Sequence, residues 1–402
     1  MKTDICIIGA GPAGLVLALQ LAKAGVKLSI LESSTSYNRS FRGESMQPDT
    51  VSIFDELEIL DELTEHGYLE THALEVTEFG KKLLNINYTN APYKYKYVMD
   101  IPQPVLLNAL LSRLRKFENC TILRGATCTD LIWDNQRVSG VKYLKKDQAE
   151  TNSIEAKLVI GADGRYSKIR KLSGLDFVKK NTERDVLWFK IPIPDKQKNN
   201  TARIIVDGSK HLILLPTFPH YYRAGVNISK GSYNNLRKKD ISAFYNLIES
   251  IDMQIGFSAR EYISSWQDVH LLDIFTIQVK KWFKDGILLI GDAAHTVTPL
   301  LGQGVNLSIQ DAMELAPILI TASKMQNIEN IDFSNFQKNR QKEIDFVLNL
   351  QLRQEKLLCA NSPVHQLIRR TSYRLINNFT FIQKRISNRI AYKRQIQNNL
   401  YL

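Results

Sequence analysis

Three glycines near the N-terminus have the spacing that the pyrophosphate of a dinucleotide requires. Gly9, Gly11 and Gly14 stand in the segment GAGPAG, between the apolar run ICII and the apolar helical pattern LVLALQLA. In such a turn the first glycine permits a tight bend, the second lets phosphates approach the backbone, and the third lets the helix pack closely on the strand. The helix N-terminus adds free N–H groups and a partial positive charge. The pattern predicts a nucleotide site that includes Pro12 and Ala13.

An acidic residue follows this turn at the distance where a ribose is held. Glu32 ends the next apolar run, VKLSILE, 18 residues after Gly14, and dinucleotide folds place a ribose-binding acid about 20 residues on. The uncharged stretch 5–22 is too rich in glycine for a membrane span, and Asp4 interrupts the basic start that a signal peptide needs. We therefore interpret residues 4–32 as a strand, turn, helix and strand that bind a dinucleotide.

Two later segments place an aspartate at the carboxyl end of an apolar strand. Asp163 follows KLVIGA, and Asp292 follows ILLIG and begins the stretch DAAHTVTPLLGQGVN, which leads into a helical pattern. In open α/β sheets, ligands bind at this end of the strands. The glycines of the second segment would leave room for a flat ring, and the helix N-terminus would stabilise an anionic reduced flavin. These contacts favour FAD as the dinucleotide. A nicotinamide-dependent dehydrogenase would instead need a substrate domain with its own catalytic His, Lys or Tyr.

Taken together, these blocks resemble the class A flavoprotein monooxygenases, whose best-known members hydroxylate aromatic rings. GAGPAG with Glu32, GADG at 161–164, and GDAAH followed by P-x-x-G-Q-G at 291–304 occur in the family's order, and the resemblance extends from position 5 to about 316. It implies an enzyme that holds FAD non-covalently and uses NAD(P)H as a transient co-substrate. It also implies that O₂ adds to the reduced flavin, and that the resulting C4a-hydroperoxide hydroxylates a mostly apolar, typically aromatic small molecule.

The resemblance also implies individual flavin contacts. Asp292 would accept a hydrogen bond from the ribitol chain, and the backbone at Pro299 would lie over the reactive edge of the isoalloxazine ring. The run 302–306 would present N–H groups to the pyrimidine end of that ring. No catalytic acid or base is implied, because the flavin carries the chemistry, and His295 stands at a helix-entry position. The remaining residues that the resemblance places against FAD are Arg42, Gln103, Thr127, Asp163, Gly302, Gly304, Val305 and Asn306.

Between these blocks the chain takes on an alternating, β-rich pattern. Residues 75–100 and 184–282 contain stretches such as DVLWFKIPIP and HLILLPTF, which indicate a mainly β substrate domain. The expected fold is α/β, a Rossmann-like FAD-binding domain of the GR2 type with this β domain inserted. The stretch HLILLPTFPHYYRAGV would form a hairpin over the substrate, with Leu214 and Pro216 in the pocket wall. The predicted FAD-binding domain comprises residues 1–74, 101–183 and 283–332.

The last segment, 333–402, is predicted to be helical and becomes increasingly basic. Residues 361–402 hold eight Lys or Arg and no Asp or Glu, in a chain whose formal net charge is +12. Apolar residues recur near helical spacing, so the segment is amphipathic. It could contact an anionic membrane peripherally, or it could dock on the body of the protein. We favour docking, with Leu367, Leu375 and Ile382 buried.

Composition argues against several other classes of protein. With 402 residues of which 44% are hydrophobic, the chain can build ordinary folded cores. Its four cysteines show no metal-site spacing and are typical of a reduced, cytoplasmic protein. No nucleic-acid-binding motif is present. The partners expected are a small-molecule substrate and O₂.

Other activities on the same fold remain open. The stretch LWFKIP superficially resembles the halogenase pattern W-x-W-x-I-P, but Val186 stands two places before Trp188, where the pattern has its first tryptophan. A flavin-dependent halogenase or a reductase is therefore the first alternative to a hydroxylase. A non-catalytic flavin-binding assembly protein is the second, and it would show no substrate-stimulated NAD(P)H oxidation.

Overall fold

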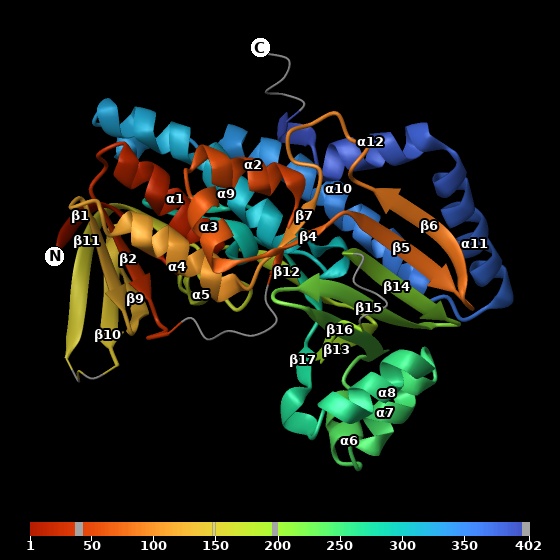
Figure 1. Ribbon diagram of the computed structural model, residues 1–402. Coiled ribbons are helices and arrows are strands. Elements are labelled where there is room, and N and C mark those ends of the chain that lie inside the picture. The colour runs from red at the N-terminus through yellow and green to blue at the C-terminus, as the bar shows by residue number, and fades with distance from the viewer. Residues whose placement is uncertain (37–42, 147, 149, 195–199, 396–402) are drawn as a thin grey trace.

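Two large β-sheets lie side by side in this computed structural model, which describes residues 1–36, 43–146, 148, 150–194 and 200–395. One sheet gathers the strands of the predicted nucleotide blocks, and the other gathers the alternating strands of the middle of the chain. Figure 1 shows helices over the outer faces of both sheets, and a long helical segment that closes one edge of the molecule. The α/β class predicted from the sequence is confirmed.

The first sheet has a parallel centre, and its central strands are buried on both faces, as parallel strands usually are. Its strands run β19, β20, β11, β1, β2 and β8, and an antiparallel arm of β10 and β9 continues from β11. The carboxyl ends of β1, β2 and β11 therefore meet at one edge. The bounds are β1 Lys2–Ile8, β2 Leu28–Glu32, β8 Cys120–Arg124, β9 Ala126–Asp134, β10 Arg137–Lys145, β11 Thr151–Gly161, β19 Phe283–Lys284 and β20 Ile287–Leu289.

Three helices pack together beside this sheet: α1 Pro12–Lys23, α4 Gln103–Leu114 and α9 Gln303–Lys324. α1 begins directly after the glycine turn, with Gly11 as its N-cap and a proline in its first turn, the position where a missing N–H costs nothing. Each of α1 and α9 thus aims an N-terminus at the edge where the parallel strands end. The shorter helices of this part are α2 Pro48–Glu56, α3 Leu60–His66 and α5 Lys168–Leu172.

The second sheet combines two separate parts of the chain. Its order is β17, β13, β16, β15, β14, β5 and β6, and β14 pairs with β5 in parallel while the other pairs are antiparallel. The predicted hairpin is the β15–β16 pair. The bounds are β5 Ala73–Glu78, β6 Lys81–Asn87, β13 Arg184–Pro192, β14 Thr201–Asp207, β15 Lys210–Thr217, β16 Tyr221–Ser229 and β17 His270–Leu272.

Helices that the sequence prediction missed cover the outer face of this sheet. The range 184–282 was expected to be β-rich throughout, but it contains α6 Tyr233–Arg237, α7 Ser242–Glu249 and α8 Met253–Tyr262. Phe244, Ile248 and Ile255 of these helices form a core with every second residue of the strands, including Leu212 and Leu214. The opposite face of the sheet is therefore the one that turns toward the first sheet.

Two small sheets join the large ones. β3 Ser45–Met46, β7 Val98–Asp100 and β4 Leu69–Thr71 form the first, and β12 Phe177–Asn181, β18 Phe275–Val279 and β21 His295–Thr296 form the second. The stretch FTIQV, expected in the substrate sheet, is β18 and lies in the second of these instead. Both small sheets connect segments that are far apart in the sequence, and they fix how the two large sheets face each other.

The C-terminal segment is helical, as predicted, in α10 Ser334–Leu358, α11 Pro363–Asn378 and α12 Thr380–Ile390. α11 lies along β6, and its side chains Arg369 and Tyr373 are buried. The burial predicted for Leu367 and Leu375 is wrong, because both side chains are on the far side of α11 and are exposed; Ile382 is half-buried. Within the described ranges, no helix has the length and apolar character to cross a membrane.

Candidate functional site

A cavity of about 940 Å³ lies between the two large sheets. Its walls come from the loops after β1, β2, β11 and β20, from the starts of α1, α4 and α9, and from the inner face of the second sheet. Most of the predicted FAD contacts are brought together here: Gly9, Gly11, Pro12, Ala13, Glu32, Gln103, Thr127, Asp163, Asp292, Pro299, Gly302, Gly304 and Val305. Gly14 and Asn306 do not line the cavity, and Arg42 lies outside the described residues.

The three glycines of the first turn serve different purposes. A Cβ on Gly9 would lie 2.5 Å from the carbonyl oxygen of Ala162, and Gly9 has a positive φ of +107°, a region that favours glycine. A Cβ on Gly14 would lie 2.1 Å from the carbonyl oxygen of Gly9. A Cβ on Gly11 would meet no protein atom within 4 Å, and Gly11 lines the cavity. Gly9 and Gly14 are therefore required by the fold, whereas Gly11 leaves space for a ligand.

Glu32 is buried at the end of β2 and holds the glycine turn in place. One carboxylate oxygen accepts a hydrogen bond from the Ala10 N–H at 2.9 Å, and the other accepts from the Ser34 N–H at 2.8 Å. The residue also lines the cavity, so its carboxylate borders the position predicted for a ribose. The Ser33 hydroxyl also donates to the carboxylate, at 3.4 Å, so these contacts hold the side chain at the cavity wall.

Asp163 is engaged by the protein itself. Its carboxylate accepts hydrogen bonds from the Ser167 hydroxyl at 2.5 Å and from the N–H groups of Lys168 and Ile169 at 2.7 and 3.0 Å. These contacts satisfy the first N–H groups of α5. Burial raises the pKa of Asp163 despite these donors. The side chain therefore shapes the loop after β11, and it lines the cavity from that position.

The loop 299–304 contains two consecutive residues with left-handed backbone conformations. Leu301 and Gly302 both have left-handed conformations, with φ of +64° and +61°, and the Gly302 N–H donates to the Pro299 carbonyl at 3.0 Å. A non-glycine residue held at positive φ costs about 1–3 kcal/mol and is characteristic of functional sites. Since Pro299, Leu301 and Gly302 line the cavity next to Asp292, the strain falls where the flavin ring is predicted.

Asn306 has a structural role that the sequence did not reveal. Its side-chain oxygen accepts from the Gln47 N–H and the Thr50 hydroxyl at 2.8 and 2.6 Å, and its amide donates to the Ser45 and Gly302 carbonyls at 3.1 and 2.8 Å. The side chain is completely buried. Asn306 therefore connects the loop 299–304 to the start of α2 and the segment before it.

A buried cluster of charged side chains holds the loop that contains Asp292 in place. Asp311 of α9 accepts hydrogen bonds from the Gly291 N–H at 2.8 Å, from His295 Nε2 at 2.6 Å and from Arg340 Nε of α10 at 2.7 Å. Burial raises the pKa of Asp311, but the charges of His295 and Arg340 outweigh burial and hold it at about 2. His295 does not line the cavity. Its contact with Asp311 helps to position the loop that contains Asp292.

The inner face of the second sheet forms the apolar wall of the cavity. The predicted wall residues must be corrected: Leu214 lies in the core with α7 and α8, and Pro216 shares its face because side chains alternate along a strand. Ile213 and Leu215, their neighbours on β15, line the cavity instead. The apolar residues of this wall are Leu74, Trp188, Ala202, Ile204, Ile213, Leu215 and Leu272.

A polar cluster that the sequence analysis missed borders this wall. Arg223 of β16 donates to the Ser45 hydroxyl at 3.0 Å and lies 3.4 Å from a Glu44 carboxylate oxygen. Ser45 in turn donates to Asp100 at 2.5 Å, and Thr71 donates to the other oxygen of Asp100 at 2.6 Å. Burial raises the pKa of Asp100 to about 6. The one sequence signal was a charged Arg223 within the alternating strand YYRAGV.

Two buried N–H groups of this wall have no partner among the described residues. Trp188 and Arg223 both line the cavity and are nine-tenths buried, and the unpaired groups are the indole Nε1 and the guanidinium Nε. The Arg223 guanidinium lies 5.4 Å from the centre of the Trp188 ring. Both nitrogen atoms are also closed to solvent, so the cavity is bordered by other atoms of Trp188 and Arg223.

These features fit FAD. At one end the cavity is lined by Gly11, Glu32 and the N-terminus of α1, and at the other end by Asp292 and the N-terminus of α9. A helix N-terminus favours negative charge such as a pyrophosphate. In the part of the chain that the structure describes, no group of three or more His, Cys, Asp or Glu could hold a metal ion.

Comparisons with known proteins agree with this arrangement. A family profile described as FAD binding domain matches residues 2–327. The 6-methylpretetramide 4-monooxygenase of Streptomyces rimosus is 31% identical over 391 residues, which cover 97% of this chain and 92% of that protein. The rifampicin monooxygenase of Streptomyces venezuelae is 25% identical over 315 residues, which cover 78% of this chain and 63% of that longer protein.

Solved structures show the same fold. PqsL of P. aeruginosa, in complex with 2-aminobenzoylacetate, superposes with a TM-score of 0.78 at 19% identity and covers 93% of this chain and 99% of that one. The anhydrotetracycline hydroxylase OxyS of Streptomyces rimosus gives a TM-score of 0.76 at 20% identity and covers 97% of this chain and 76% of that one. At these identities the likeness concerns the fold alone.

Proposed function

We propose, because this chain belongs to the class A flavoprotein monooxygenases, that it uses NAD(P)H and O₂ to hydroxylate a flat aromatic polyketide. The observation that carries the proposal is one cavity that joins the dinucleotide turn at Gly11 to an apolar sheet wall bordered by Arg223. The relative that is similar along almost its whole length is named for an aromatic polyketide, 6-methylpretetramide. The cavity of about 940 Å³ extends from the dinucleotide turn to the apolar sheet wall, so a substrate would lie between the flavin ring and that wall.

When bound, FAD supplies hydride acceptance from NAD(P)H and the transfer of one oxygen atom from O₂. The tasks of this chain are to hold the cofactor, to orient the substrate and to exclude water. Gly11 and Glu32 would hold the nucleotide end, and Asp292 with the α9 N-terminus would hold the ring end, where their N–H groups stabilise negative charge. NAD(P)H would bind transiently, since no second glycine-rich fingerprint appears in the sequence.

The substrate would lie flat against the β13–β16 part of the sheet. A Cβ on Gly225 would lie 2.8 Å from the Trp188 ring, so the glycine lets that ring lie close against the strand and present a flat apolar surface. The guanidinium of Arg223, which lines the cavity beside Trp188, would attract keto or phenol oxygens of the substrate. Asp100, linked to Arg223 through Ser45, would hold the guanidinium in place.

Replacing Trp188 by alanine should weaken substrate binding by about tenfold or more, because the apolar surface that the substrate would bury against the ring is lost. The dissociation constant can be measured from the change in flavin absorption when a polycyclic phenol is added. Trp133→Ala is the matched control, since Trp133 is exposed on β9. Equal affinities for both variants would remove Trp188 from the substrate site.

A screen for substrate-stimulated NAD(P)H consumption tests the proposed function. The purified yellow protein is mixed with polycyclic phenols and quinones, and products are identified by mass. We expect stimulation by at least one such compound and a product one oxygen atom heavier. A halogenated or reduced product would support the alternative activities. FAD-loaded protein that no aromatic compound stimulates would favour a non-catalytic role.

A further inference from the structure

We propose that the outward face of α11 and α12 binds the surface of an anionic membrane. This face, called the α11–α12 face below, consists of Val364, Leu367, Ile368, Leu375, Phe379 and Phe381, with Arg374, Lys384 and Arg385 beside them. The inference concerns where the protein binds, and it stands independently of the reaction proposed above.

The apolar side chains of this face are strongly exposed. All six are between 47% and 66% exposed, and they are six of the nineteen large hydrophobic side chains exposed in the described part of the chain. They fall within eighteen consecutive residues, and the rings of Phe379 and Phe381 lie 6.3 Å apart. Isolated exposed apolar residues need no explanation, but a contiguous group indicates an interaction site.

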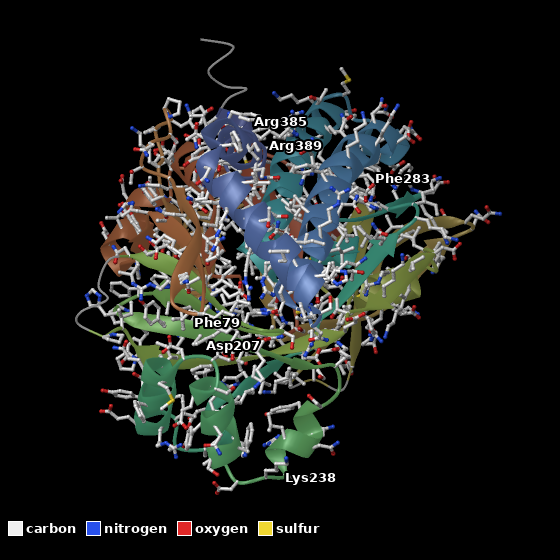
Figure 2. All side chains as sticks on the ribbon, turned by 90° about the vertical axis from the view of Figure 1, so that its right-hand side faces the viewer. Phe79, Asp207, Lys238, Phe283, Arg385 and Arg389 are labelled. Carbon is white, nitrogen blue, oxygen red and sulfur yellow. The ribbon has the colours of Figure 1, made fainter. Side chains whose placement is uncertain are left out.

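The opposite side of α11 is firmly docked, so the exposed face has a defined orientation. Arg369 is fully buried and forms an ion pair with Glu78 of β5, and Arg370 contacts the same carboxylate at 2.7 Å. Tyr373 is buried and donates to Gln354 of α10 at 2.7 Å. Figure 2 shows α11 crossing the face of the molecule turned to the viewer. Because Arg369 and Tyr373 contact the body of the protein, the apolar residues on the opposite side of α11 point outward.

The cations beside this face are free of acidic partners. Arg374, Lys384 and Arg385 are exposed and form no ion pair among the described residues, whereas Lys393 and Arg394 pair with Glu343 and Glu56. Positions 361–402 contain no Asp or Glu that could neutralise them. On α12, Lys384 and Arg385 are three and four positions from Phe381, so they lie on its face of the helix. In Figure 2, Arg385 and Arg389 lie at the outer end of this segment.

An anionic lipid surface fits this combination better than a second copy of the chain. In a twofold dimer the same patch meets itself, so Arg374, Lys384 and Arg385 would face their own copies and repel them. At a membrane, an apolar helix face enters the boundary between headgroups and acyl chains, and flanking Lys or Arg reach anionic headgroups. The apolar side chains and the cations of the α11–α12 face would then both contact the same partner.

Sedimentation with lipid vesicles tests the proposal on the full, FAD-loaded chain. One set of vesicles contains phosphatidylcholine with about one third phosphatidylglycerol, and the other contains phosphatidylcholine alone. We expect binding to the anionic vesicles, little binding to the neutral ones, and loss of binding as salt rises, because salt screens exposed charges. Equal binding to both sets, or no binding to either at low salt, would overturn the proposal.

Two variants separate the apolar and the charged contributions. Phe379→Ser with Phe381→Ser should weaken binding about tenfold or more, because both rings leave the acyl boundary. Arg374→Gln, Lys384→Gln and Arg385→Gln should each weaken binding about fivefold. Phe257→Ser is the matched control, since Phe257 is 59% exposed on α8. Unchanged binding by the double phenylalanine variant, or self-association of the parent chain that this variant abolishes, would overturn the proposal.

Discussion

Replacing Gly11 by valine should give a folded protein that no longer retains FAD. An added side chain at Gly11 would meet no protein atom within 4 Å, and the residue is not among the positive-φ glycines, so the fold can accept valine. The side chain would instead occupy the cavity at the N-terminus of α1, where the pyrophosphate is proposed to lie. Overpacking alone costs about 1–3 kcal/mol, and lost phosphate contacts add to it, so FAD should bind on the order of a hundredfold more weakly.

The matched control is Gly14→Val in the same turn. Its side chain would collide with the Gly9 carbonyl at 2.1 Å, so this variant should fail to fold rather than fold without FAD. The two outcomes are separated by circular dichroism of the apoprotein and by flavin absorbance per protein molecule. A Gly11→Val protein with a normal flavin content would show that the nucleotide binds elsewhere.

Replacing Asp311 by asparagine should lower the free energy of unfolding by about 3–5 kcal/mol, as expected when a buried charge loses its partner. Arg340 is buried and its Nε contacts Asp311 at 2.7 Å. The Asp292 loop, which Asp311 holds through Gly291 and His295, should also loosen and retain FAD less well. Urea unfolding of the apoprotein measures the stability.

Glu314→Gln is the control for this prediction. Glu314 contacts the same arginine at 3.1 Å, but its side chain is 43% exposed, and exposed ion pairs contribute about 0–1 kcal/mol. The Asp311 variant should therefore lose several times more stability than the Glu314 variant. Similar losses in both would contradict the role assigned to the buried cluster.

The pKa of Asp311 also predicts how the free energy of unfolding changes at acidic pH. The pKa of Asp311 in the folded protein is about 2, below the value of about 3.9 for an unfolded chain. Its contribution is therefore complete above pH 4 and is lost as the pH falls toward 2. Asp100 acts in the opposite sense, because burial raises its pKa to about 6, so its contribution is lost as the pH rises through 6. Asp311→Asn should flatten the profile below pH 4 only.

The nucleotide part of the site could be predicted from the sequence because its determinants are local. The turn at Gly9 and Gly11 and the loop after Asp292 each lie in one short segment, in which backbone geometry dictates the residue type. The sequence could not show which residues bind a ligand and which serve the fold. Gly14 and Asn306 do not line the cavity, and the contacts of their backbone or side chain are with the protein itself.

The substrate part could not be predicted in the same way because it is assembled from distant strands. Ser45, Asp100 and Arg223 come from three separate segments and meet only in the folded chain. The alternating pattern of β15 defines two faces but does not indicate which of them is covered by helices. In the structure, α7 and α8 cover the face that contains Leu214. For α11, the inward face is set by the pairing of Arg369 with Glu78, a contact across 291 positions.

The source of the oxygen atom in the product tests the central claim most directly. The purified, FAD-loaded protein is incubated with NAD(P)H and a stimulating polycyclic phenol under isotopically labelled O₂ in unlabelled water. A flavin monooxygenase that works in this cavity predicts one labelled oxygen atom in each product molecule, and NAD(P)H consumption that depends on the phenol. A product whose new oxygen comes from water, or one that carries no new oxygen, would contradict it.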